Sequence, residues 1–137
     1  MIEKEILEAL QQPAIAVAGT LSLAVKPFGI VIPIPNDGKW LELVPIPNNI
    51  EGQFWGDEKT YRGVFRLILH WPVDSEGPYP ALTIMNTISG AFSKGSVFQN
   101  GAVSVTITEQ PNLTGALEAQ NEILYPVSVR YQVDWKG

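Results

Sequence analysis

Three segments of the chain alternate between apolar and polar residues with the period of a half-buried β-strand. In residues 61–71 one set of alternate positions carries Tyr61, Phe65, Leu67, Leu69 and Trp71, and the other carries Arg62, Arg66 and His70; Pro72 then ends the run. Residues 102–108 repeat this pattern on a smaller scale, and every second residue from Ile123 to Trp135 is apolar. Because successive side chains of a strand point to opposite faces, each segment predicts a strand with one face in the core.

Two other segments have the spacing of an amphipathic helix. Residues 2–12 begin with acidic residues and carry their apolar residues on one side, which predicts a first helix. Residues 80–93 open on Pro80, which suits a first helical turn, and repeat apolar residues at spacings of three and four before Gly95. The polar side of this second helix has hydroxyls and amides but no charge, and we expect it to face a partner.

The segments between the first helix and the central strand are harder to assign. The apolar run 14–25 is too short to span a bilayer, which takes about 20 residues, and predicts a buried strand. Residues 29–34 are expected to be extended, and residues 40–44 to form a short strand. Pro45 and Pro47 then indicate an irregular connection.

These elements predict an α+β fold. We expect one domain over residues 1–137, with a mostly antiparallel or mixed β-sheet flanked by two helices at about residues 2–12 and 80–93. A chain of 137 residues is long enough to bury a core without a disulfide or a structural metal.

Charge and cysteine content exclude several classes of function. The net charge is −5, and the nine basic residues are scattered singly. Binding to nucleic acid through neutralisation of its phosphates is therefore not expected. The chain has no Cys, which rules out disulfides and thiolate chemistry. The acidic N-terminus does not resemble a signal peptide, and we predict no association with a membrane.

Candidate chemistry is sparse. His70 is the one histidine, so sites built on several histidines are excluded, and its place within a strand predicts a structural role. The acidic pairs Asp57-Glu58 and Asp74-Glu76 are typical of solvated turns, and no glycine motif for phosphate binding occurs. We therefore predict no catalytic residues, no metal and no cofactor, and we expect that the protein is not an enzyme.

Two regions are candidate contact surfaces. Phe54 and Trp55 stand in an irregular connection, between two glycines. The segment 110–122 is too long for a tight turn, and two interpretations stay open for it: a solvated loop, or an arm that is ordered against a neighbouring subunit. The candidate interface residues are Phe54, Trp55, Asn112, Leu113 and Leu117.

Five segments carry a resemblance to a known family. In order, they are GKWLELVPIPN, TYRGVFRLILHWP, ALTIMNTISGAF, SVFQNGAVSVTIT and YPVSVRYQVDW. Their order and spacing resemble the tail terminator proteins of long-tailed bacteriophages, a group that includes small phage-related domains of this size. The apolar stretch 14–34 departs from the usual pattern of that family.

The resemblance implies a structural role. It predicts a virion protein that is assembled in the host cytoplasm into a ring, usually a hexamer, at the head-proximal end of the tail. The ring would cap the tail tube, stop its polymerisation and offer a surface for joining to the head. The expected partners are other copies of the chain, the tail tube protein and a head-neck connector protein.

Two alternative functions stay open. The first is a head-completion or neck connector protein of the same virion. The second is a module that binds a small ligand or carbohydrate through its tryptophans, Trp40, Trp55, Trp71 and Trp135. Because Trp71 and Trp135 fall on apolar strand faces, a shared exposed platform is not expected.

Overall fold

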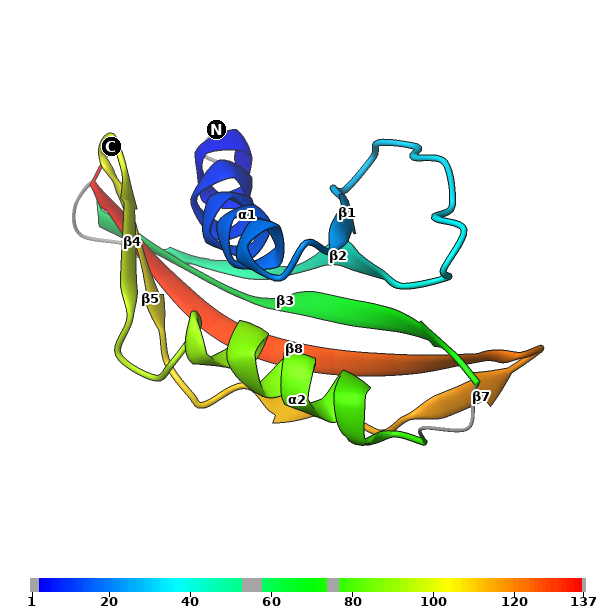
Figure 1. Cartoon of the computed structure of the whole chain (residues 1–137). Coiled ribbons are helices and arrows are strands. Elements are labelled where there is room, and N and C mark those ends of the chain that lie inside the picture. Colours follow the sequence, from blue (N-terminus) through cyan, green and yellow to red (C-terminus); the bar gives the residue numbers. More distant parts are fainter. Residues whose placement is uncertain (1–2, 53–57, 74–76, 137) are drawn as a thin grey trace.

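The computed structural model describes residues 3–52, 58–73 and 77–136 (Figure 1). Within these ranges the chain forms two helices and one curled mixed sheet of eight strands. The helices are α1 (Glu3–Thr20) and α2 (Tyr79–Gly90). The strands are β1 (Ala24–Lys26), β2 (Trp40–Gly52), β3 (Glu58–Pro72), β4 (Val97–Asn100), β5 (Val103–Ile107), β6 (Asn112–Leu113), β7 (Leu117–Ala119) and β8 (Glu122–Lys136). The predicted α+β class with two helices is confirmed.

Three long antiparallel strands, β2, β3 and β8, form the middle of the sheet (Figure 1). The sheet has the order β1-β2-β3-β8-β5-β4, and β1 is parallel to β2. The short strands β6 and β7 pair with β8 on the side where β5 also pairs. One edge of the sheet is therefore β1 with the free part of β2, and the other edge is shared by β4, β6 and β7.

The core lies between one face of this sheet and both helices. Odd-numbered residues of β2, β3 and β8, such as Leu43, Phe65 and Val129, are completely buried against the helices. Even-numbered residues such as Arg66 and Ser128 lie on the opposite face and are partly exposed. The alternation that predicted these strands is thus the division between the core face and the outer face of the sheet.

The first helix is longer than predicted. It was expected to end near residue 12, with a buried strand over residues 14–25, but α1 continues through Pro13 to Thr20 and only Ala24–Lys26 is strand. A proline inside a helix removes one backbone hydrogen bond and costs about 3 kcal/mol, and for this reason Pro13 predicts the end of the helix. Burial offsets this cost, since the apolar side continues past the proline at a spacing of four in Ile6, Leu10, Ala14 and Ala18.

The assignments around β2 also differ from the prediction. Residues 29–34, expected to be an extended segment, lie in the loop between β1 and β2, and β2 continues through Pro45 and Pro47. Both prolines are tolerated because β1 pairs only with residues 40–42 and leaves the rest of that edge of β2 open. The two prolines are two residues apart, so the N–H groups that they lack would point to the same side of the strand.

The segment 110–122 is neither a free loop nor a projecting arm in the folded chain. Asn112 and Leu113 pair with Ser128 and Val127, and β7 pairs with the beginning of β8. The left-handed backbone of Gln120 and Asn121 makes the turn between β7 and β8. The segment therefore lines an edge of the sheet.

Candidate interaction surfaces

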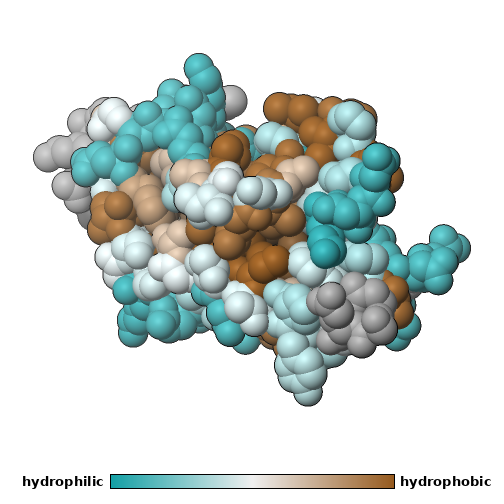
Figure 2. All heavy atoms as spheres, viewed as in Figure 1, coloured by the Kyte–Doolittle hydropathy of each residue, from teal (hydrophilic) through white to brown (hydrophobic). Residues whose placement is uncertain are grey.

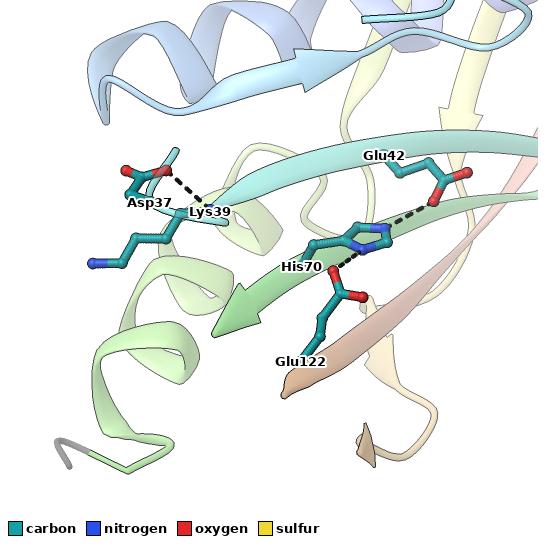
Figure 3. A network of polar contacts seen from close by, with 5 residues as sticks. All are labelled: Asp37, Lys39, Glu42, His70 and Glu122. Atoms are coloured by element: carbon teal, nitrogen blue, oxygen red, sulfur yellow. Dashed lines mark hydrogen bonds and ion pairs between the residues drawn. The ribbon is translucent and has the colours of Figure 1, made fainter. Parts of the chain in front are cut away.

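A partly buried polar network surrounds His70, itself buried, on the outer face of the sheet (Figure 3). Its Nε2 lies 2.9 Å from Oε1 of Glu42, and its Nδ1 lies 2.6 Å from Oε1 of Glu122. The ring of Trp40 stacks on the imidazole, with centroids 3.7 Å apart and planes 10° apart. The three strands β2, β3 and β8 each supply one polar residue, so the network ties the middle of the sheet together.

This geometry supports a structural role for His70. A carboxylate oxygen accepts hydrogen bonds but cannot donate them, so both contacts are hydrogen bonds only when both ring nitrogens carry a hydrogen. The imidazole is covered by Trp40 and flanked by two carboxylates, so it has no free nitrogen with which to activate a nucleophile. Within the described residues, no group of three His, Asp or Glu residues is placed to hold a metal ion.

An open pocket of about 400 Å³ lies elsewhere on the outer face, between β3, β8 and the segment that contains β6. Its lining is mixed, with Ile46 and Val64 beside the polar residues Arg66, Glu109, Gln110, Asn112, Thr114, Ser128 and Arg130. The Nε atom of Arg66 is buried there without a hydrogen-bond partner among the described atoms. Nε of Arg130 lies 3.6 Å from Oε2 of Glu109, and both side chains are largely exposed. Arg66 and Arg130 thus line the same pocket, and guanidinium groups suit contact with an acidic group.

A second surface is the apolar loop, residues 27–38 between β1 and β2. Its large side chains point into solvent: Val31 is 91% exposed and Ile34 72% exposed, and about half of Phe28 and Ile30 is accessible. In Figure 1 the loop stands away from the rest of the chain, and hydrophobic residues gather over the same region in Figure 2. An exposed apolar patch of this kind is a candidate contact surface.

Hydrogen bonds and prolines restrain the backbone of the apolar loop. The N–H of Phe28 donates to Oε1 of Gln11 on α1 at 2.9 Å, and the N–H of Gly38 donates to the carbonyl of Pro35 at 3.0 Å. Oδ1 of Asp37 accepts from the N–H of Lys39, as Figure 3 shows. Prolines also fix the φ angle at three positions, 27, 33 and 35. The exposed side chains are thus presented on a restrained backbone, which lowers the entropy lost on binding.

Three of the five predicted interface residues lie within the described residues. Asn112, Leu113 and Leu117 are exposed on β6 and β7, at one edge of the sheet. Phe54 and Trp55 lie outside the described residues. The prediction that these residues form an interface remains a prediction. The sequence interpretation missed the apolar loop, although three prolines within an apolar run argue against a central strand.

The tryptophans whose side chains the structure describes do not form a binding platform. Trp71 is buried in the core, and Trp40 is stacked on His70. Trp55 lies outside the described residues, and the side chain of Trp135 is also outside them. Neither of the described helices has the length and apolar character needed to cross a membrane.

The fold defines a small α+β protein whose surface carries a restrained apolar loop and a pocket lined in part by two arginines. A family model for phage tail terminator proteins matches residues 5–131. The chain therefore belongs to the phage tail terminator family, and it is a structural protein of a phage tail.

Other comparisons agree on the fold. One solved structure is similar over 100% of this chain and 99% of that chain, with a TM-score of 0.82 and 21% sequence identity. At this identity the similarity shows the fold alone. A comparison of the sequence with curated proteins finds no match.

Proposed function

We propose that this protein forms a ring, a hexamer as the family resemblance implies, on the last ring of the tail tube. The ring stops polymerisation of the tube and provides the surface to which the head is joined. The observation that carries this proposal is the match to the terminator family over nearly the whole chain. The exposed apolar loop supports it, since a subunit of an assembly must offer surface to its neighbours.

The mechanism is assembly by shape. A ring forms when head-to-tail contacts close after a fixed rotation, and a closed ring has two different faces. One face matches the end of the tube, whereas the other does not match a further tube subunit, so growth ends. The net charge of −5 per subunit gives the ring an acidic character, which disfavours adhesion of the genome as it passes.

The experiment is a deletion with complementation in the phage. Without this protein, tubes seen by negative-stain microscopy are expected to have uncontrolled lengths and to be unattached to heads. Supplying the wild-type chain should restore one uniform length and joined particles. Tubes of uniform length that fail only in joining would instead assign the protein to the neck.

A further inference from the structure

The length of the apolar loop follows from topology, but its composition does not. Strands β1 and β2 are parallel and adjacent, so the chain must return from the end of β1 to the beginning of β2, and such a connection takes a dozen or more residues. Polar residues would serve this purpose in water. The exposed side chains of Phe28, Ile30, Val31 and Ile34 therefore need another explanation.

The register of the sheet shows what lies opposite the loop. The loop rejoins the sheet at Trp40, and a row of paired residues crosses the sheet from there: Trp40 with His70, His70 with Leu124, and Leu124 with Leu117. Leu117 on β7 thus lies at the other edge of the sheet, at the same height along the strands.

This far end of the row is also apolar. Leu117 is 63% exposed, and Leu113 on β6 is exposed at the same edge. In the described residues β7 pairs with β8 alone, so its other side has free backbone groups. We call Leu113 and Leu117 the β7 edge.

We infer that copies of this chain join head to tail, with the apolar loop of one copy seated on the β7 edge of the next. The inference places the ring axis along the long strands, because a rotation about such an axis, without translation, brings together surfaces at the same height along the strands. The two apolar surfaces meet this condition, since they lie at opposite ends of one cross-strand row. The occupant is thus a second copy, because the chain itself carries the matching surface. This inference rests on the proposed ring.

Site-specific cross-linking tests the contact, because the natural chain has no Cys and gives no background. Two loop variants, Val31→Cys and Ile34→Cys, are each combined with Leu117→Cys in one chain. The protein is oxidised mildly, both free and bound to purified tail tubes. A disulfide forms only where the Cα atoms approach within about 7 Å. We expect at least one pair to give a ladder of covalent oligomers up to the ring size, and each single variant to give none.

Val97→Cys supplies the matched control. Val97 is exposed on β4 at the same side of the sheet, but it pairs with Thr106, which pairs with Gln132. Gln132 is eight residues along β8 from Leu124, the partner of Leu117 (132 − 124 = 8). At about 3.3 Å per residue the two positions are about 26 Å apart along the strands. The pair Val31→Cys with Val97→Cys should therefore not form a ladder.

Charge substitutions test whether each contact joins the apolar loop of one copy to the β7 edge of the next. Val31→Asp and Leu117→Asp should each lose the ring while keeping the wild-type melting temperature, since both positions are exposed. Mixed together, the two variants retain one intact contact between an unchanged loop and an unchanged β7 edge. The mixture should give dimers and no larger species in light scattering.

The outcomes separate this inference from the proposed function. Rings or capped tubes without a ladder from either loop pair would overturn the inference and leave the ring intact, as would a ladder from the Val97 control. Rings that survive both Asp variants would overturn it in the same way. If the wild-type chain forms no ring, alone or on tubes, the proposed function fails and the inference fails with it.

Discussion

Gly63 and Tyr131 face each other across β3 and β8, and the phenol ring of Tyr131 occupies the space where residue 63 would have a side chain. A Cβ atom at residue 63 would lie 2.6 Å from Oη and 2.8 Å from Cζ of Tyr131, and 3.2 Å from the carbonyl oxygen of Ile46. The glycine is therefore required for the close approach of a buried tyrosine, not for a turn.

Gly63→Ala should destabilise the protein. The added methyl group must displace a ring that is buried in the core, and such overpacking costs roughly 1–3 kcal/mol. The free energy of unfolding in urea measures the effect. In a Tyr131→Leu background, which removes both near atoms, the same substitution should cost less.

Gly19→Ala is the matched control. Beyond its chain neighbours and the backbone of its own helix, no atom of the described residues lies within 4 Å of a Cβ at residue 19, which is in the last turn of α1. This change should be neutral or stabilise by up to about 1 kcal/mol, as alanine favours helix. Equal effects of the two substitutions would show that the contact between Gly63 and Tyr131 is not tight.

Tyr131 should also make stability depend on pH in alkali. Burial raises the pKa of its phenol above the ordinary value of 10.0. Since the folded-state pKa is the higher one, the stabilisation is fully present below pH 10.0 and is lost as the pH rises through the folded-state pKa. Tyr131→Phe should therefore flatten the fall in the free energy of unfolding above this pH.

The ultraviolet absorbance of tyrosinate measures the titration directly. The pKa of Tyr61 is also raised, by burial first and by the charge of Glu3 second, so the spectrum of Tyr131→Phe must be subtracted from that of the wild type. The difference should titrate above pH 10.0. A difference that titrates at or below this value would contradict the burial of Tyr131.

His70→Phe should destabilise the sheet. Phenylalanine keeps a ring beside Trp40 but removes both contacts to Glu42 and Glu122. Hydrogen bonds to charged groups contribute about 1.5–3 kcal/mol, and the loss should appear as a lower free energy of unfolding. Glu118→Gln, at an exposed carboxylate on β7, should change it by less than about 0.5 kcal/mol. An unchanged stability of His70→Phe would mean that the network does not hold the three strands together.

Val129→Asp should prevent folding. Val129 is completely buried opposite Phe65, and an unpaired carboxylate there costs several kcal/mol. Arg130→Ala, at the next residue on the exposed face, should leave solubility and melting temperature nearly unchanged. Soluble, normally folded Val129→Asp protein would show that this face of β8 is not the core.

The sequence predicted the elements whose pattern comes from burial on one face. Strands β3, β5 and β8 each have a core side and an outer side, and alternation at a period of two reports this directly. The second half of α1 was not predicted, because Ala, Val and Gly after Pro13 form a run without polar residues to mark a helical period. Its spacing of four is visible only once buried Ala14 and Ala18 are distinguished from their apolar neighbours.

The surfaces were less predictable than the strands, since exposure of an apolar residue depends on what the rest of the chain covers. Leu113 and Leu117 were expected in a contact region and are exposed. Val31 and Ile34 were expected in an extended segment, yet they are among the most exposed apolar residues. Hydropathy cannot distinguish a buried run from one that is covered only in an assembly.

The most direct test of the proposed function is electron microscopy of purified tail tubes mixed with this protein and then with fresh tube subunits. We predict a ring of density at one end of each tube and no further growth from that end. Tubes that lengthen at both ends as they do without the protein, with no density at either end, would contradict the proposal.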